Sequence, residues 1–252
     1  MEEIINLADK RIVIAGASSG IGRQTSILLS NLGAKVVLIA RREDHLRSVM
    51  EELTGKDNAY YVWDLSETEN TETLVKCIVE DQGKLDGLVY AAGTNKSMPL
   101  SQFKPDRLEQ VFKTNYFGFI EMVRQVCKRG RYNERMRIVG ISSVAATRGD
   151  KAHLAYSGSK AAMDASVRCI AKEVAEKGIC INTVVPAMTR TEMYKKYIED
   201  HGEESNKDLL KRQYLGLIET EDVANTIAFL LSPAARMITG LSLPVDGGLT
   251  TN

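Results

Sequence analysis

Short apolar runs alternate along the chain with longer segments of helical periodicity, and this alternation constrains the fold more than any other feature. A continuous apolar run is typical of a strand that is buried on both faces of a parallel sheet. Parallel neighbours need long crossover connections, and the helical segments between the runs can supply them. We expect strands over residues 11–15, 35–40, 60–63, 85–92, 137–141, 179–185 and 241–245.

The helical segments carry start and stop signals that agree with this scheme. Gly33 and Gly178 each follow a helical pattern, and Pro105 is favourable in a first helical turn. A polar segment over residues 187–216 contains only short helical pieces. The sequence therefore predicts a Rossmann-like, doubly wound α/β fold, with one domain over residues 1–252 and a seven-stranded parallel sheet. The first expected helix follows the glycine-rich turn and ends near residue 32. The others cover residues 43–53, 67–81, 105–128, 155–177 and 219–231.

Charge and cysteine content exclude several classes of protein. Lysine plus arginine equals aspartate plus glutamate at 33 each, so we expect no nucleic-acid partner and no membrane partner. The cysteines have no CxxC spacing, which predicts neither a metal site nor a disulfide framework. No apolar run approaches the ~18 residues of a membrane span and the N-terminus has no apolar signal core, so we expect a cytoplasmic protein. The cysteines are Cys77, Cys127, Cys169 and Cys180.

A glycine-rich turn separates the first apolar run from the first helical segment, with the spacing G-x-x-x-G-x-G. Glycines in such a turn let backbone N–H groups approach a pyrophosphate, and the helix N-terminus adds partial positive charge. A tight turn without a ligand is the alternative, but the strand–turn–helix context favours a dinucleotide site. The candidate phosphate-binding residues are Gly16, Ser18, Ser19, Gly20, Ile21 and Gly22.

The end of the second apolar run indicates which dinucleotide is bound. A carboxylate about 20 residues after the glycines would bind the ribose 2′-hydroxyl of NAD(H). This chain has Ala40 there, followed by Arg41 and Arg42, whose guanidinium groups favour the 2′-phosphate of NADP(H). Asp64 follows the third run and could accept a hydrogen bond from an adenine amino group. A helix-capping role shared with Ser66 is nearly as well supported.

Ser143, Tyr156 and Lys160 form the candidate catalytic group. The i, i+4 spacing places Tyr156 and Lys160 on one helix face, one turn apart. A free tyrosine has a pKa of about 10, and an adjacent ammonium would lower the pKa of Tyr156 towards neutrality. Ser143 follows the fifth run, where a rigid sheet can hold its hydroxyl beside the phenol. Such a group can bind a carbonyl oxygen and transfer a proton to it.

Together these motifs resemble the short-chain dehydrogenase/reductase family, in its single-domain branch. The segment 15–22, AGASSGIG, is similar to the family's cofactor loop, and Ser143, Tyr156 and Lys160 match its catalytic Ser and Y-x-x-x-K. Asn115 matches the Asn that completes the family's tetrad. The segment 238–248, ITGLSLPVDGG, is similar to the end of 3-oxoacyl-carrier-protein reductases.

The resemblance implies a role for each matched residue. In the family Tyr is the acid-base, Ser orients the carbonyl, and Lys binds the nicotinamide ribose. Asn holds a water that links Lys to solvent. The segment 186–191, PAMTRT, resembles the family's stretch over the nicotinamide. The further cofactor contacts that the resemblance implies are Leu65, Ala92, Gly93, Tyr156, Lys160, Pro186, Thr189 and Thr191.

Three positions depart from the family pattern. The family's N-N-A-G is Tyr90-Ala91-Ala92-Gly93 here, which we expect to lose side-chain hydrogen bonds in the sheet. Its P-G is Pro186-Ala187, and the first Thr of its glycine loop is Ala15. No departure removes a catalytic group, so we expect an active NADP(H)-dependent oxidoreductase that interconverts a carbonyl and a secondary alcohol without a metal.

Two substrate classes remain open. The C-terminal resemblance indicates 3-oxoacyl thioesters, and Arg129, Arg131 and Lys172 could dock an acidic acyl carrier; ordinary helix-end charge explains these residues equally well. The loop before Tyr156 is heavily polar, which favours a polar ketone, a sugar or a secondary-metabolite carbonyl. A catalytically silent cofactor-binding protein is a further alternative that the intact tetrad disfavours. The loop's polar residues are Arg148, Asp150, Lys151 and His153.

Apolar residues on two helices predict a homotetramer. In similar reductases the helices that begin near residue 105 and carry Tyr156 pair across a two-fold axis. Their apolar sets are wider than one face against a sheet requires, and a surplus stripe usually marks a partner. The alternative is that all of these side chains pack inside one subunit. The residues are Phe112, Phe117, Phe119 and Met122 on the first helix, and Met163, Val167 and Ile170 on the second.

Overall fold

A computed structural model describes residues 5–202, 207 and 210–251. Its seven strands form one parallel sheet in the order β3-β2-β1-β4-β5-β6-β7. The chain therefore winds outwards in both directions from β1 and β4, which confirms the predicted doubly wound fold. The strands are β1 Arg11–Ala15, β2 Lys35–Ala40, β3 Ala59–Val62, β4 Leu85–Tyr90, β5 Tyr132–Ile141, β6 Cys180–Pro186 and β7 Ser242–Val245.

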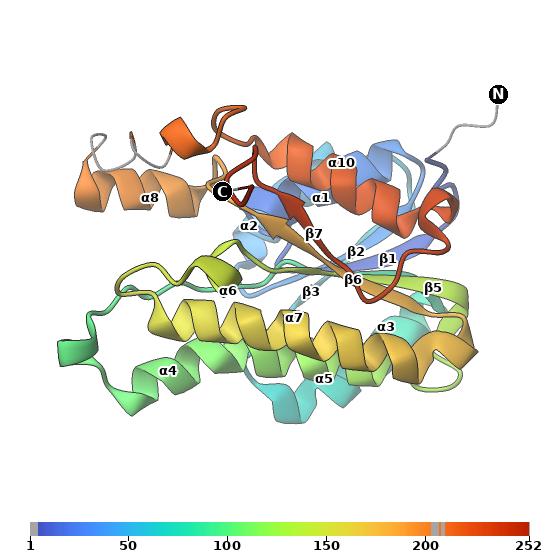
Figure 1. The fold of residues 1–252 in the computed structure, drawn as a ribbon. Helices are drawn as coiled ribbons and strands as arrows, with labels where there is room; N and C mark the ends of the chain where they lie inside the picture. The colour runs from blue at the N-terminus through green and yellow to red at the C-terminus, as the bar shows by residue number, and fades with distance from the viewer. Residues whose placement is uncertain (1–4, 203–206, 208–209, 252) are drawn as a thin grey trace.

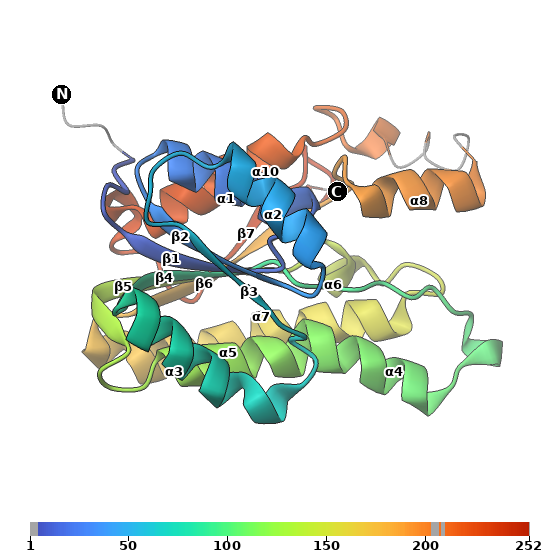
Figure 2. The same cartoon turned by 180° about the vertical axis from the view of Figure 1, so that it is seen from behind.

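Helices cover both faces of the sheet. One layer holds α1 (Gly20–Asn31), α2 (Glu43–Glu52) and α10 (Thr220–Leu231) (Figure 1). The other layer holds α3 (Thr71–Gln82), α4 (Pro105–Phe112), α5 (Gly118–Val126) and α7 (Leu154–Val174), as both views show (Figure 2). The helix α8 (Glu192–His201) follows β6 and projects beyond the sheet (Figure 1). Shorter segments are η1 Thr68–Asn70, η2 Leu100–Gln102, η3 Lys113–Phe117, α6 Ala145–Arg148, η4 Ala175–Lys177 and η5 Pro233–Ala235.

Alternate side chains of the strands enter two separate cores. Val13 and Val37 pack with residues of α3, α5 and α7, whereas Ile12 and Val36 pack with residues of α1 and α10. Each fully buried Val, Leu or Ile contributes about 1.5–3 kcal/mol relative to an exposed one, so both layers hold the sheet rigid. A rigid sheet is what allows strand ends to place functional side chains.

Two elements differ from the expectation from sequence. The helix expected over 105–128 ends at Val126 and contains a π-helical segment, Lys113–Phe117, between α4 and α5. The strand expected from residue 137 begins at Tyr132, because Tyr132 pairs with Leu85 before a register shift. Its first half is largely exposed and polar, so it has no continuous apolar signal.

The segment over residues 187–216, which was expected to hold helical pieces, includes α8; its residues 203–206 and 208–209 lie outside the described residues. In the part of the chain that the structure describes, no helix is both long enough and apolar enough for a bilayer crossing.

Candidate active site

The glycine turn is shaped by its contact with the loop after β4. Gly16 has φ +88°, and a Cβ there would overlap the backbone of Ala91 and Ala92. A Cβ at Gly22 would overlap the carbonyl of Gly16. Both positions therefore require glycine, because the turn folds tightly on itself and against the loop after β4.

The N-terminus of α1 is open to an anion. Its N-cap, Ser19, makes no side-chain capping hydrogen bond, and the first turn of α1 has no acidic residue. The first N–H groups of a helix need an external partner, and a phosphate is a suitable one. The methyl of Thr191 lies 3.2 Å from where a Cβ of Gly20 would be, so the segment after β6 passes over this turn. The turn therefore fits a dinucleotide pyrophosphate.

The two arginines after β2 lie beside the glycine turn and the end of β3. The Arg42 guanidinium donates to Ser18 Oγ at 3.1 Å. The exposed Arg41 reaches Asp64 at 3.5 Å. Asp64 also accepts hydrogen bonds from Ser66 N and Oγ, which form a local turn. The expected capping role is wrong, because the N-cap of the next helical segment, η1, is Glu67. Burial raises the pKa of Asp64, but the Ser66 hydrogen bonds and the Arg41 charge outweigh this and lower it.

The remaining sequence-predicted cofactor contacts lie around the same strand ends. Pro186 is the last residue of β6, and its carbonyl accepts from Val144 N. Thr189 is buried, and its hydroxyl donates to the Ala187 carbonyl at 3.1 Å. Leu65 is buried in the core beneath α3 and α5, and Ile21 packs partly buried against the opposite core.

Tyr156 lies near the start of α7, partly buried, and its phenol lies beside Ser143, which follows β5. Burial raises the pKa of Tyr156, and the Ser143 hydrogen bond opposes this increase. The net increase differs from the sequence expectation that Lys160 would lower the pKa of Tyr156. Burial disfavours the charged phenolate more strongly than its neighbours stabilise it.

Lys160 directs its amine towards the sheet. Its Nζ donates to the Ile141 carbonyl at 2.5 Å and lies 5.8 Å from the centroid of the Tyr156 ring. Burial lowers the pKa of Lys160 to about 8, and the negative charge of Asp164 opposes the decrease. The structure thus brings Ser143, Tyr156 and Lys160 together at the end of β5.

Asn115 holds the loop after β4 with three side-chain hydrogen bonds. Its Oδ1 accepts from Thr94 N at 2.8 Å, and its Nδ2 donates to the Thr94 carbonyl and to Ser159 Oγ, both at 3.0 Å. A Cβ at Gly93 would lie 3.6 Å from both Asn115 Oδ1 and Lys160 Nζ. The amide of Asn115 is therefore occupied in positioning the loop beside Lys160.

Tyr90 is a site residue whose role the sequence did not reveal. The buried Tyr90 hydroxyl donates to the Thr114 carbonyl at 2.6 Å, so the side chain bonds to a helical segment outside the sheet. Thr114 belongs to the π-helical segment that carries Asn115. Such segments often occur at functional sites. In the sequence, the only indication of this role of Tyr90 was the presence of a tyrosine where the family has Asn.

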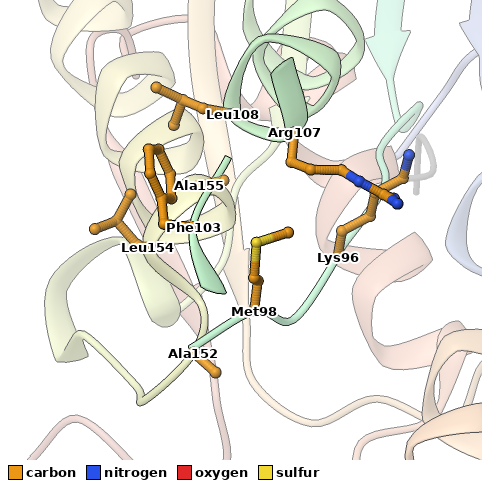
Figure 3. A pocket seen from close by; sticks show the side chains of 8 residues that line it. All are labelled: Lys96, Met98, Phe103, Arg107, Leu108, Ala152, Leu154 and Ala155. Carbon is orange, nitrogen blue, oxygen red and sulfur yellow. The ribbon is translucent and has the colours of Figure 1, made fainter. Parts of the chain in front are cut away.

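A cationic groove lies beside the start of α7. It has a volume of about 520 Å³ and no carboxylate among its lining residues. Met98 N donates to the Ala152 carbonyl at 2.7 Å, and Ser97 Oγ lies 3.1 Å from His153 Nε2. An apolar crevice adjoins it, with Lys96 and Arg107 at one side of Met98 (Figure 3). The groove is lined by Lys96, Ser97, Met98, Gln102, Lys104 and Arg107.

Arg131 is not available to an acyl carrier, which corrects one sequence expectation. Its guanidinium is buried and donates to Gln125 at 2.6 Å and to Glu72 at 3.2 Å. Arg129 and Lys172 are exposed. In the described part of the chain, no group of three or more His, Cys, Asp or Glu residues could hold a metal ion.

Known proteins match this chain along most of its length. A family model described as Enoyl-(Acyl carrier protein) reductase matches residues 16–250. The chain is 35% identical over 252 residues to L-xylulose reductase of Caenorhabditis elegans, covering 98% of each protein. It is 29% identical over 245 residues to the 3-oxoacyl-(acyl-carrier-protein) reductase FabG of Vibrio cholerae, covering 97% of this chain and 99% of that one.

A solved structure extends the likeness to three dimensions. A crystal structure of an actinorhodin polyketide ketoreductase variant with NADPH gives a TM-score of 0.90 at 29% identity, and the match covers 97% of this chain and 98% of that one. Because the likenesses span nearly the whole chain, and because the relatives are reductases of similar length, this protein is a member of the short-chain dehydrogenase/reductase family of oxidoreductases.

Proposed function

We propose that the protein is an NADP(H)-dependent oxidoreductase that interconverts a carbonyl compound and a secondary alcohol. The observation that carries this proposal is the placement of Ser143 beside the phenol of Tyr156, with the buried amine of Lys160 5.8 Å from the centroid of the Tyr156 ring. The raised pKa of Tyr156 means that its phenol keeps its proton at neutral pH. A protonated phenol suits reduction, in which the substrate oxygen must gain a proton.

Each residue of the group has a role in this proposal. Tyr156 donates the proton, and Ser143 shares the substrate oxygen so that negative charge developing there is stabilised. Lys160 places a positive charge beside both, and Asn115 positions the loop next to Lys160. The nicotinamide, when bound, supplies hydride in reduction and accepts it in oxidation.

The residues around the glycine turn support NADP(H) as the cofactor. The open N-terminus of α1 would hold the pyrophosphate, and Arg41 and Arg42 would bind a 2′-phosphate. Ala40, at the end of β2, has no carboxylate that would repel this phosphate. The similar actinorhodin ketoreductase structure, which contains NADPH, favours the same cofactor.

The cationic groove favours a substrate with a negatively charged portion. Lys96, Lys104 and Arg107 line it without a carboxylate to neutralise them. A 3-oxoacyl thioester of a phosphorylated carrier has this character, in agreement with the likeness to FabG. A polar ketone or sugar is the second candidate, favoured by the likeness to L-xylulose reductase and by the polar loop before Tyr156.

A reductase assay tests the proposed activity. We expect oxidation of NADPH with acetoacetyl-coenzyme A, its N-acetylcysteamine thioester or L-xylulose. Tyr156→Phe should lower kcat by at least about a hundredfold and leave the Kd of NADPH unchanged, because only the proton donor is lost. Tyr61→Phe, which removes an exposed hydroxyl on β3, is the matched control. Full activity of Tyr156→Phe would refute the acid-base assignment.

The two thioesters also test the substrate class, because they share an acyl group and differ in phosphate. We expect Lys104→Ala with Arg107→Ala to raise KM for acetoacetyl-coenzyme A and to leave KM for the neutral thioester unchanged. Lys56→Ala is the control, since Lys56 is exposed, precedes the edge strand β3 and does not line the groove. A faster reaction with L-xylulose than with either thioester would favour the second candidate.

A further inference from the structure

A second buried ionisable residue lies one helical turn beyond Lys160. Asp164 faces the same side of α7 and is buried. An isolated buried carboxylate is costly, so its partners indicate what it does. No feature of the tetrad, the glycine turn or the arginine pair accounts for this residue.

The partners of Asp164 come from two strands that are distant in sequence. Its Oδ2 accepts from Ser142 Oγ at 2.9 Å, and its Oδ1 accepts from Thr183 Oγ1 at 2.7 Å. The Thr183 hydroxyl also lies 2.9 Å from Ser242 Oγ on β7. The carboxylate therefore joins α7 to β6 and to the residue that directly follows β5.

These contacts help to position two members of the candidate catalytic group, Ser143 and Lys160. Ser142 precedes Ser143, the residue beside the Tyr156 phenol, and Ser142 Oγ also lies 3.4 Å from the Lys160 carbonyl. The Lys160 amine donates to the carbonyl of Ile141, directly before Ser142. A shift between α7 and the end of β5 would displace Ser143 relative to Lys160, and the Asp164–Ser142 hydrogen bond opposes that shift.

The electrostatic surroundings of Lys160 are simple in the described part of the chain. Along α7 it is flanked by Tyr156 and Asp164, and from β5 it meets the Ile141 carbonyl. From the π-helical segment and the loop after β4 it faces the neutral Asn115 and Gly93. Asp164 is therefore the charged group that favours the ammonium form, whereas burial disfavours it.

We propose that Asp164 is a positioning residue of the active site, whose buried carboxylate holds the end of β5 against α7 and keeps the Lys160 amine positively charged. The proposal rests on the proposed role of Lys160 in carbonyl reduction. Asp164 touches neither substrate nor cofactor in this account. It acts through Ser142 and Lys160.

The test separates the charge of Asp164 from its hydrogen bonds. Asp164→Asn removes the charge, whereas Thr183→Val removes one hydrogen bond and keeps the charge. We expect Asp164→Asn to lower the pKa of Lys160 below its value of about 8, and Thr183→Val to leave that pKa unchanged. The alkaline limb of the reduction rate should move to lower pH by the same amount in Asp164→Asn alone.

The titration of Lys160 can be measured without turnover. We would follow the signal of ¹³C-labelled lysine by NMR and assign it by its loss in Lys160→Met. An unchanged Lys160 titration in folded Asp164→Asn would overturn the electrostatic role. An equal shift in Thr183→Val would show that Asp164 acts only through packing and hydrogen bonds, and not through its charge. If Asp164→Asn does not fold, Asp164→Ser, which removes the charge and leaves a small polar group, serves in its place. A protein that shows the predicted titration but reduces no ketone would instead contradict the proposed function.

Discussion

At the scale of single residues, the site depends on side chains whose charge the surroundings control. Burial disfavours the charged forms of both Lys160 and Tyr156, and it therefore shifts their two pKa values in opposite directions. Burial lowers the pKa of the amine and raises the pKa of the phenol, which brings the lysine towards neutrality and keeps the tyrosine protonated. The proposed reduction requires a proton on the phenol, so burial of Tyr156 would favour that reaction.

Arg41 and Arg42 permit a prediction about cofactor preference. Arg41→Ala with Arg42→Ala should raise KM for NADPH about ten- to a hundredfold relative to NADH, because a charge-assisted phosphate contact contributes roughly 1.5–3 kcal/mol. Steady-state kinetics with both cofactors measure this ratio. Arg47→Ala, which removes an exposed arginine paired with Glu43 on α2, should leave the ratio unchanged. A wild-type preference for NADH would show that the cofactor proposal is wrong.

At the scale of elements, the junction between the π-helical segment and α5 controls where Asn115 lies. Gly118 begins α5, and a Cβ there would overlap the Leu65 carbonyl and the Tyr90 hydroxyl. The absence of a side chain lets Tyr90 reach the Thr114 carbonyl inside the π-helical segment. The helix irregularity and the glycine therefore form one packing arrangement.

Two glycine-to-alanine substitutions in helices should have opposite effects on stability. Gly118→Ala should lower the free energy of unfolding by about 1–3 kcal/mol, because the new methyl group would overpack the contact with Leu65 and Tyr90. Gly158→Ala in α7 should leave it unchanged or raise it by up to about 1 kcal/mol. Its Cβ would lie 3.6 Å from the Phe112 ring, and alanine favours helix. Urea unfolding compares the two, and equal stability of both variants would contradict this packing account.

At the scale of the whole molecule, most of the apolar stripe that predicted an oligomer packs inside the subunit. Four of these residues are not surplus apolar side chains at the surface, as had been expected, because they are fully buried: Phe119, Met122, Met163 and Val167. Phe117 is different, because 46% of its surface is exposed. It lies in an aromatic cluster with Phe112 and Tyr116, with ring centroids 5.6–6.2 Å apart. A subunit contact would therefore be centred on this cluster.

We predict a homotetramer that Phe117→Glu weakens, since burial of a charge at the contact is costly. Light scattering at micromolar concentration should give four times the chain mass of 27.9 kDa for the wild type and a smaller mass for the variant. Val62→Glu on the edge strand β3 is the control, because Val62 is similarly exposed at 45%. A wild-type protein of the monomer mass would contradict the tetramer.

The features that were predictable from sequence depend on contacts between residues close in the chain. Apolar runs marked the strands because a strand buried on both faces is composed mostly of apolar residues, and every predicted strand is present in the sheet. The glycine turn and the pairing of Tyr156 with Lys160 on one helix face follow from local backbone geometry. The polar first half of β5 had no such signal, and its pairing with Leu85 was missed.

By itself, then, the amino-acid sequence determined the doubly wound fold and the strand end at which Ser143 meets Tyr156. Only the tertiary structure decided where the buried groups find their partners. The Lys160 amine bonds to a carbonyl 19 residues away, Tyr90 reaches a carbonyl 24 residues away, and Asp164 binds hydroxyls 19 and 22 residues away. Arg131, expected at the surface, is buried against Glu72, 59 residues distant. Burial and distant hydrogen bonds control protonation, and no local pattern encodes them.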